Sequence, residues 1–598
     1  MDKATLYDKI YACWLGKNIG GTLGEPVEGR KELMNLTFFP RLSETGDPLP
    51  NDDLDLQLVN LHAVEQYGIN LTCAELGREW TEHVYFPYDE YGYGATALRL
   101  GLRPPFSGKY DNPFTNCMGS PIRSELWAAL AHGRPALAAY FAWQDAVVDH
   151  AGGEGLYGEM FYAALEAMAY ERDVRSHDDA AALISDALAY VPSASRTYAA
   201  LTDMLRWYRE GVSYLAMRDK ILAAHGRSNF TDAPQNIAFT MVGLLYGDDF
   251  GDGILKAVNL GYDTDCTGAT LGALYGILYG RSYIPEKWSA PIGQRITVSA
   301  AVRGFDAPAD LAELTERTIR LGDMLALSDE GRFKMTADEE CSFDYQRFVF
   351  PDGASKNNNI YADISYPDGV CAVPYSDFTV DVKFVNNSNA KWTFEAYIDG
   401  GAAFTPSKRQ IITAERAQSV SARFVIRAGE LDITSGAPCG RAFRPSLVVR
   451  RINDGNLWAD YRAPFTVLRA AKWICDGVER YIDGGELHFD SRDIAHTAET
   501  TLRNLSDREC RLMFASTSAV KVELDGNVII DSAPVDTYMP AFHRCPGQQA
   551  PILPLYRGEH KIKVTVTGAD AYFMFAPLAT NKNTEPGAFY YYTDTVIG

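Results

Sequence analysis

The spacing of apolar residues changes once along the chain. In roughly the first 340 residues they recur three and four positions apart, as in 158–171 and 268–280, which is the spacing of one face of a helix. Beyond about residue 345 they alternate with polar residues in short runs between turn residues, as in 378–385 and 421–428, which is typical of half-buried strands. The chain is therefore expected to combine a helical part with a β part.

The length requires several cores, because one hydrophobic core stops growing at about 250 to 300 residues and the chain has 598. We predict a multidomain protein with an all-α domain over 1–340, an immunoglobulin-like β-sandwich over 345–468 and a second, jelly-roll-like β-sandwich over 469–598. Asp525, Gly526 and Asn527 stand between two alternating runs and predict a hairpin turn in the last domain.

Composition narrows the classes of partner. The net charge is −22, from 56 Lys+Arg against 78 Asp+Glu, which disfavours binding to a phosphate backbone, so we expect no nucleic-acid partner. There is no run of 18 apolar residues, so we expect no membrane partner. The ten cysteines form no Cys-x-x-Cys pair and are expected to be reduced thiols in a cytoplasmic protein.

A first acidic motif begins at Asn51 and continues with Asp52, Asp53 and Asp55, directly before an amphipathic helix. Such residues satisfy the free N–H groups and the dipole at a helix start, so a simple cap is the favoured interpretation of this motif taken alone, and a cation site is the alternative. Asp55 lies about half a turn from Asp52 and Asp53, so it fits the cap better than a shared site.

A second acidic motif opens another helix about 210 residues later. Asp263 and Asp265 follow Gly261 and Tyr262 on an irregular segment, where both carboxylates can point into one cavity, as a hard divalent cation requires. Capping explains this segment equally well. If the two motifs converge in a helical bundle, however, close carboxylates would repel strongly. Bound metal would resolve that conflict.

The second motif, GYDTDCTGATLGALYG over 261–276, resembles the Gly-Gly-Asp-Thr-Asp-Thr signature of the ADP-ribosylglycohydrolase family. Residues 51–53 resemble its Thr-Asp-Asp metal motif, and 16–28 resemble its Gly-Asp-Ala-Leu-Gly-x-Pro-Val-Glu segment. The resemblance covers about the first 330 residues and neither β domain. It implies an all-α ADP-ribosylglycohydrolase-like domain that acts on ADP-ribosyl groups.

The resemblance also implies two Mg²⁺ ions, or Mn²⁺, beside the ribose of the substrate. Carried over position by position, the ligands would be Asn51, Asp52, Asp53, Asp263 and Asp265. Asn51 stands where the family has Thr or Ser, and its amide still offers an oxygen. Cys266 stands where the family has a ligating Thr, and a thiol is a poor partner for Mg²⁺. Either Thr267 compensates, the second ion binds weakly, or a softer metal is used.

Cleavage of a ribosidic bond needs an activated water and a carboxylate that takes its proton. Glu28 matches the glutamate of the family's mobile loop beside the metals, and Glu90 lies in a segment that loosely resembles the one carrying the general base in some members. Asp53 is a third candidate. A hydrated surface carboxylate is the alternative for both glutamates.

Further segments are expected to line the same cavity. Residues 116–123 resemble the family's Gly-rich segment before a helix, where Gly119 and Ser120 could hold a diphosphate. Residues 149–155 resemble its Ser-His-Gly-Asp region, with His150 and Gly153, although a packed His150 is equally reasonable. Tyr262 could stack on a sugar or base, although a packed aromatic is just as reasonable. Glu25, Asn236 and Trp288 are weaker candidates.

The main hypothesis is a metal-dependent hydrolase of N- or O-ribosyl bonds in ADP-ribosylated protein or a smaller ribosyl compound. One alternative is a glycoside hydrolase that acts on a furanoside or another carbohydrate with the same scaffold. Another is a non-catalytic glycan-binding protein that uses exposed aromatic side chains in the β domains, such as Trp392, Trp458 and Trp473.

Overall fold

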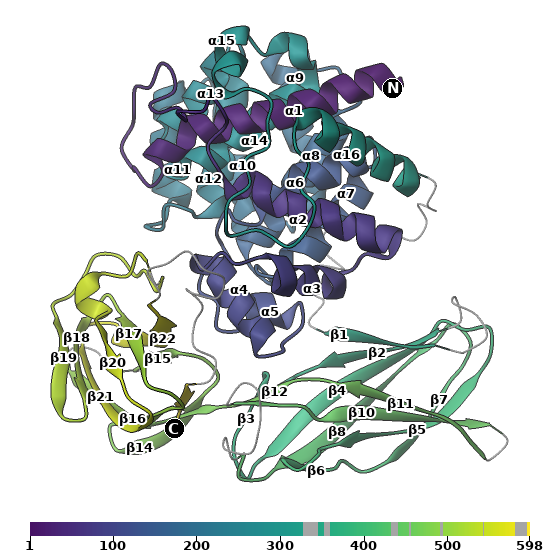
Figure 1. Cartoon of the computed structure of the whole chain (residues 1–598), viewed down its shortest axis with the longest axis vertical. Coiled ribbons are helices and arrows are strands. Elements are labelled where there is room, and N and C mark those ends of the chain that lie inside the picture. Colours follow the sequence, from purple (N-terminus) through teal and green to yellow (C-terminus); the bar gives the residue numbers. More distant parts are fainter. Residues whose placement is uncertain are drawn as a thin grey trace. The chain divides into compact units, whose positions relative to one another are not determined.

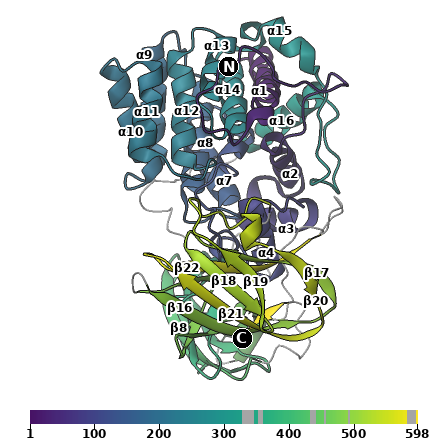
Figure 2. The ribbon, with the colours of Figure 1, turned by 90° about the vertical axis from the view of Figure 1, so that its left-hand side faces the viewer.

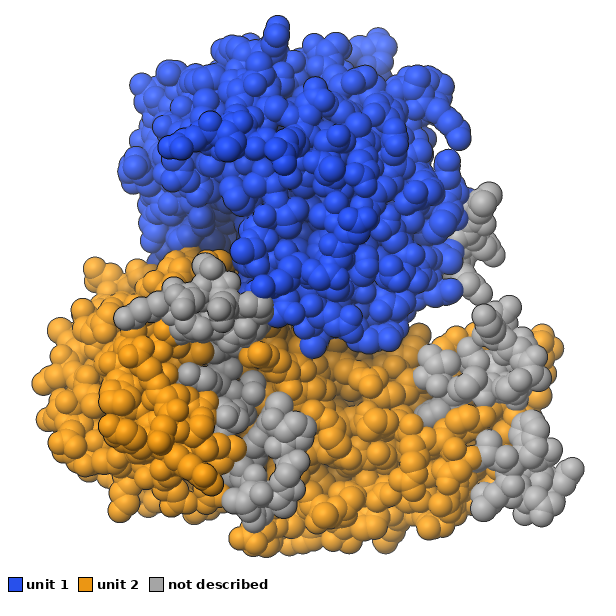
Figure 3. Space-filling view, viewed as in Figure 1, with its two compact units in different colours: residues 1–86, 112–342 blue, residues 87–111, 343–598 orange. Residues whose placement is uncertain are grey.

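The structure, a computed structural model, describes residues 1–326, 345–351, 359–431, 441–453, 456–490, 494–541, 543–580 and 595–598. The chain forms two compact units (Figure 3), and the chain passes between them more than once. The first unit comprises Met1–Phe86 and Asn112–Ser342, and the second comprises Pro87–Asp111 and Phe343–Gly598.

The named elements that the structure describes in the first unit are all helical (Figures 1 and 2). Among the described residues of this unit, three α-helices precede the first crossing to the other unit and eleven follow the return. They are α1 (Lys3–Gly24), α2 (Asp52–Tyr67), α3 (Cys73–His83), α6 (Ser124–Leu130), α7 (Pro135–Ala146), α8 (Glu154–Ala169), α9 (His177–Ala187), α10 (Arg196–Arg209), α11 (Tyr214–His225), α12 (Ala233–Tyr246), α13 (Phe250–Asn259), α14 (Thr264–Tyr279), α15 (Glu286–Ser289) and α16 (Leu311–Ala326). Within the described ranges, none of the helices has the length and apolar character needed to cross a membrane.

Helices α1 and α14 pack with their backbones almost in contact. A Cβ atom on Gly16 would lie 2.0 Å from the carbonyl oxygen of Gly272, and one on Gly20 would lie 1.9 Å from that of Gly268. The four-residue spacing of these glycines places them on one face of each helix. Because the helices approach so closely, the start of α14 lies beside the end of α1, where the chain continues to Glu28.

The second unit contains a first β-sandwich. One sheet has the strand order β1 (Gln346–Pro351), β2 (Asn359–Ser365), β4 (Asp377–Asn386), β8 (Ser419–Ala428) and β6 (Phe404–Thr405). The other has the order β11 (Asn456–Pro464), β10 (Ser446–Asn453), β5 (Trp392–Asp399) and β7 (Gln410–Ala414). All of these pairs are antiparallel. A small third sheet has the order β3 (Cys371–Ala372), β12 (Val467–Arg469) and β9 (Ala442–Phe443), in which β12 is parallel to β3 and antiparallel to β9.

A second β-sandwich follows in the same unit. Its larger sheet has the order β14 (Val478–Ile482), β13 (Ala471–Cys475), β16 (Ala495–Asn504), β21 (Gly558–Thr567), β18 (Ala519–Leu524) and β19 (Asn527–Ser532), with β23 (Val596–Ile597) beside β16. Its smaller sheet has the order β15 (Glu486–His488), β22 (Tyr572–Ala579), β17 (Arg508–Ala515) and β20 (Ile552–Leu555). The hairpin between β18 and β19 turns at Asp525 and Gly526, both with positive φ. The predicted fold class, an all-α domain followed by two β-sandwiches, is confirmed.

The aromatic side chains that were expected to be exposed in the β domains are buried instead. Trp392 and Trp473 are each 1% exposed, and they belong to the two separate hydrophobic cores of the sandwiches. Trp392 starts a strand whose inward positions alternate with outward ones, so its side chain fills the core. The side chain of Trp458 lies outside the described residues. The expectation that Trp392 and Trp473 bind a glycan at the surface was therefore wrong.

A helical segment of the predicted all-α region belongs to the second unit. It contains α4 (Asp89–Arg99) and α5 (Phe106–Lys109). Its apolar residues Ala97, Leu100, Leu102 and Phe106 are part of the core of the first sandwich. The compact units thus differ from the predicted domain boundaries over 87–111, because helical periodicity does not say which core a helix packs against.

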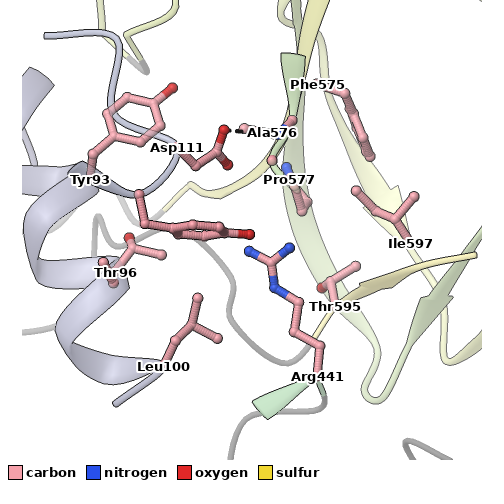
Figure 4. A pocket seen from close by; sticks show the side chains of 14 residues that line it. Tyr93, Thr96, Leu100, Asp111, Arg441, Phe575, Ala576, Pro577, Thr595 and Ile597 are labelled. Carbon is pink, nitrogen blue, oxygen red and sulfur yellow. Dashed lines mark hydrogen bonds between the residues drawn. The ribbon is translucent and has the colours of Figure 1, made fainter. Parts of the chain in front are cut away.

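The same segment lines a pocket inside the second unit (Figure 4). Tyr93 and Thr96 of α4 and Leu100, which directly follows this helix, stand on one side, and side chains of β22 stand on the other. Arg441 reaches into the space between them, and the carboxylate of Asp111 accepts a hydrogen bond from the backbone N–H of Gly485 at 2.8 Å. Burial raises the pKa of Asp111 to about 6.

Candidate metal and catalytic site

The first acidic motif is both a helix cap and part of a buried cluster. The side-chain oxygen of Asn51 accepts a hydrogen bond from the backbone N–H of Asp53 at 2.8 Å, which caps α2. The carboxyl group of Asp55 is oriented differently, because it accepts hydrogen bonds from the backbone N–H of Ser299 at 3.2 and 3.3 Å. The sequence favoured a capping role for Asp55, but the cap bond is made by Asn51, and the carboxyl group of Asp55 binds the segment at Ser299 instead.

The second motif is held by the loop that carries Glu28. Gly261 and Tyr262 both have positive φ, at 81° and 71°. A Cβ on Gly261 would lie 2.7 Å from the carbonyl oxygen of Arg30, so glycine is needed for this close approach. The N–H of Tyr262 donates to the carbonyl of Arg30 at 2.6 Å, and the N–H of Gly29 donates to that of Tyr262 at 2.9 Å. These bonds set Glu28 next to the aspartates.

The side chain of Asn236 on α12 holds the second acidic motif in place through hydrogen bonds. Its side-chain oxygen accepts a hydrogen bond from the backbone N–H of Asp263 at 3.2 Å, and its amide group donates to the carbonyls of Phe230 and Asp232 at 2.7 and 2.9 Å. Asn236 was a weak candidate in the sequence, and in the structure its hydrogen bonds hold the backbone at Asp263; its contact with a substrate stays a prediction.

The two motifs converge although about 210 residues separate them. One potential ligand atom each from Glu28, Asp263 and Asp265 lie within 4.8 Å of one another, and the same holds for Asp53, Asp265 and Cys266. Asp265 therefore belongs to both groups. Asp52, which is half-buried, adds its negative charge next to Asp265. This is the convergence that the sequence-based hypothesis required.

The cluster carries more negative charge than the surrounding protein compensates. Burial raises the pKa of Asp53, Asp263 and Asp265 well above the ordinary range, and neighbouring carboxylates raise it further. The ammonium group of Lys17 lies 3.4 Å from Asp53 Oδ1 but only 2.8 Å from Glu125 Oε1, so its charge is shared. Burying carboxylates in this way is costly unless cations neutralise them.

Several oxygens of the cluster have no hydrogen-bond partner among the residues that the structure describes. They are both oxygens of Asp263, Oδ1 of Asp265 and Oδ2 of Asp53. Buried polar atoms are nearly always satisfied in native proteins. Unpartnered carboxylate oxygens that face one another are the donor set that a hard divalent cation takes, so these residues fit a metal centre.

The two residues at the uncertain ligand position lie in the first turn of α14. Burial raises the pKa of the Cys266 thiol well above its usual value, so this side chain presents a neutral thiol in the absence of metal. The hydroxyl group of Thr267 donates to the carbonyl of Thr264 at 3.2 Å and is fully buried. The metal-binding roles of Cys266 and Thr267 stay predictions.

Three other candidates lie in the first unit with packing or surface contacts of their own. Glu25 forms an ion pair with Arg41 at 2.5 Å. Tyr262 is half-buried, with the guanidinium of Arg218 5.9 Å from its ring centre. Trp288 is 0% exposed and packs against two phenylalanine rings, which assigns it to the core.

Ser120 and His150 belong to a buried polar network around Arg123. The guanidinium of Arg123 lies 3.0 Å from Asp145 and 2.8 Å from Asp149. The nitrogen Nδ1 of His150 lies 3.0 Å from Asp149 Oδ1, and the hydroxyl of Ser120 donates to Glu159 at 2.5 Å. All of these side chains are 0% exposed, so contact between Ser120 or His150 and a substrate stays a prediction without geometric support.

The two glycines of these segments also have structural tasks. The carbonyl of Gly119 accepts a hydrogen bond from Arg123 at 2.9 Å. A Cβ on Gly153 would lie 2.1 Å from the carbonyl oxygen of Thr115. Glu90 is 5% exposed on α4 of the second unit, and its catalytic role likewise stays a prediction.

An all-helical domain that gathers buried, unpartnered carboxylates from two distant loops has the features of a metal-dependent hydrolase. The model of the ADP-ribosylglycohydrolase family matches residues 2–322, and the chain belongs to this family of hydrolases. The proposed resemblance is thereby confirmed.

Two known proteins illustrate the similarity. The ADP-ribosylarginine hydrolase Tri1 of Serratia proteamaculans (strain 568) is 46% identical over 52 residues, which are 9% of this chain and 14% of that protein. The chain therefore matches only a small part of this curated relative. A solved structure described as an ADP-ribosylglycohydrolase-related protein complex is 19% identical, with 54% of this chain and 99% of that chain covered and a TM-score of 0.33.

Proposed function

We propose that the protein hydrolyses an N- or O-ribosyl bond at a site with two divalent cations, Mg²⁺ or Mn²⁺. The observation that carries this proposal is that potential ligand atoms of Glu28, Asp53, Asp263 and Asp265 gather in one place. The three aspartates there contribute buried carboxylate oxygens without hydrogen-bond partners among the described residues. Membership of the family supports the hydrolytic chemistry. The ADP-ribosyl group is the first substrate to test, and the cation pair and the scissile bond are parts of the same proposal.

Divalent cations held by these carboxylates would supply the positive charge that orients ribose hydroxyls and activates water. The chain itself supplies the base. Glu28 is exposed, whereas Asp53, Asp263 and Asp265 are buried, so Glu28 is the carboxylate of the cluster that can face both the substrate and the solvent. We assign it the role of accepting the proton of the attacking water.

The buried aspartates have a different task from Glu28. The ion pair between Lys17 and Asp53 fixes one wall of the cluster from α1, and Asn236 fixes the backbone of Asp263. Rigid placement of this kind keeps the reacting groups in a productive geometry without reorganisation during the reaction.

The experiment is a panel of ADP-ribosyl-arginine, ADP-ribosyl-serine, ADP-ribose and synthetic furanosides and pyranosides, each incubated with Mg²⁺ and with EDTA. We expect one ribosyl substrate to be hydrolysed only with the cation. The product identifies the bond, and turnover of a pyranoside alone would favour a glycoside hydrolase. Hydrolysis at an equal rate in EDTA would refute the metal centre.

Glu28→Gln tests the base with a matched control. The change keeps the size of the side chain and should lower kcat by roughly 100-fold or more, the usual loss for a general base. Glu32→Gln alters an exposed carboxylate of the same loop and should leave kcat unchanged. Equal kcat values for Glu28→Gln and the parent protein would remove Glu28 from this role.

A further inference from the structure

A second cluster of metal-ligating side chains lies in the first unit, well away from the aspartates. It combines His62 of α2 with Glu79 and His83, which stand one turn apart on α3. Figure 1 labels both helices. One ligand atom from each lies within 4.8 Å of the other two. Along α2, His62 is nine residues beyond Asp53, or about 14 Å at the helical rise, so the two clusters are separate.

The spacing of the three ligand atoms is close to that of a zinc site. Glu79 Oε2 lies 2.7 Å from His62 Nδ1 and 3.5 Å from His83 Nε2. Four-coordinate Zn²⁺ with bonds of about 2.0 to 2.2 Å holds its ligand atoms roughly 3.3 Å apart. Adjustments well within side-chain motion would therefore place all three atoms around one ion.

The outer nitrogen of His83 fixes its proton. His83 Nδ1 lies 2.9 Å from the backbone carbonyl of Arg303, and a carbonyl only accepts, so Nδ1 carries the hydrogen. In the neutral ring, Nε2 then presents a lone pair toward the carboxylate of Glu79. Two acceptors face each other across 3.5 Å, a conflict that a cation between them removes.

His62 differs from His83 in its outer contact. The side-chain amide nitrogen of Gln66 lies 3.3 Å from Nε2 of His62 and can only donate, so in the neutral ring Nδ1 carries the hydrogen and donates to Glu79 at 2.7 Å. Metal-binding histidines almost always donate from the nitrogen that does not bind the ion. Binding through Nδ1 therefore requires the Gln66 amide to turn over, so that its oxygen accepts a hydrogen bond from Nε2.

The surroundings also suit an ion. The side chains of Glu79 and His83 are 3% and 9% exposed, whereas that of His62 is 19% exposed, which leaves an entry path. The ring of Phe305 lies 5.4 Å from that of His62 and 5.5 Å from that of His83. Two imidazoles and one carboxylate favour Zn²⁺ over Mg²⁺, which takes oxygen ligands.

We propose that His62, Glu79 and His83 form a structural site for Zn²⁺ or a similar transition-metal ion, with water in the remaining position. The ion would join α2 to α3. Because His83 also holds the segment at Arg303, and Ser299 just before it binds Asp55 in the first turn of α2, the site would steady the helix that begins with the aspartates of the catalytic centre.

The test uses the full-length protein, stripped of metal by a chelator and then saturated with Mg²⁺ to occupy the carboxylate centre. Titration with Zn²⁺ should show uptake of one equivalent, and Co²⁺ should give the visible absorption of a four-coordinate ion with nitrogen ligands. The Co²⁺ spectrum needs no substitution, so it does not depend on how well a variant folds. Failure of the parent protein to take up either ion would reduce the cluster to an ion pair and overturn the proposal.

Substitutions then locate the ion. His62→Ala and His83→Ala should each weaken Zn²⁺ binding by more than the roughly 10- to 100-fold lost with an outer partner. His225→Gln is the matched control, because His225 lies 3.0 Å from Asp203 in a simple His–carboxylate pair. Cys266→Ser should also still take up one equivalent of Zn²⁺. Unchanged uptake in both histidine variants, or its loss in Cys266→Ser, would place the ion elsewhere.

Discussion

Replacing Asp263 with Asn should make the cation-free protein more stable while it abolishes hydrolysis. Asp263 is 1% exposed, both of its carboxylate oxygens lack partners among the described residues, and Asp265 and Glu28 lie within 4.8 Å. Without metal this carboxyl group either repels its neighbours or holds a proton. Asparagine keeps the shape of the side chain and removes both costs.

The size of the gain can be bounded. At an effective dielectric constant of about 20, two unit charges 4.8 Å apart repel by about 3.5 kcal/mol. A single charged neighbour of Asp263 would cause a repulsion of this size. Taking up a proton instead costs about 5 kcal/mol at pH 7.5 for a group with an ordinary pKa near 3.9. Protonation sets the upper limit, so Asp263→Asn should raise the free energy of unfolding by roughly 3 to 5 kcal/mol in EDTA.

The assay is urea unfolding of the parent and the variant in EDTA and in saturating Mg²⁺. The parent should gain stability from Mg²⁺, and the variant should gain little because it has lost a ligand. Asp219→Asn, whose side chain is 81% exposed, is the control and should change stability by less than about 0.5 kcal/mol. A variant no more stable than the parent in EDTA would refute the view that unneutralised charge strains this cluster.

Three further predictions concern single residues. Cys266→Thr should tighten Mg²⁺ binding in a calorimetric titration, because a hydroxyl oxygen replaces a thiol; an unchanged affinity would exclude position 266 as a ligand. Gly20→Ala should lower the free energy of unfolding by about 1 to 3 kcal/mol, because the new Cβ would lie 1.9 Å from the carbonyl oxygen of Gly268. An unfolding curve equal to that of the parent protein would contradict the close packing. Burial raises the pKa of Asp111 to about 6. The protonated carboxyl group is therefore more stable in the folded state than in the unfolded state. As the pH rises from 4 through 6, this difference removes about 3 kcal/mol from the free energy of unfolding. Asp111→Asn should lack this part of the pH dependence in chemical denaturation at pH 4 and 7.5, and an equal loss in both proteins would show that Asp111 titrates normally.

Local patterns in the sequence were sufficient for the fold class and for the acidic motifs. Asp53, Asp263 and Asp265 stand in short segments whose residue types already carry the chemistry, and the helix and strand periods hold through most of the described chain. The buried position of Trp392 was also readable, because it shares an alternating run with Phe394 and Ala396, which places all three on one face of the strand.

The supporting residues could not be read in the same way. Lys17 lies within an apolar helix, and nothing near it in the sequence indicates that it contacts Asp53 and Glu125, which are 36 and 108 positions away. In the same way, nothing beside Arg123 in the sequence indicates that it pairs with Asp145 and Asp149 in the folded protein. Pairings over such distances depend on how helices pack, which periodicity does not determine.

Because residues 87–111 belong to the second unit, a single cut in the chain cannot separate the two units. Cutting the chain near residue 340 would separate the β-sandwiches from Ala97, Leu100, Leu102 and Phe106, which fill part of their hydrophobic core. The same cut would leave the isolated hydrolase fragment with those apolar side chains uncovered. Neither half would therefore have a complete hydrophobic core of its own. Expression of either half alone should yield aggregation-prone protein.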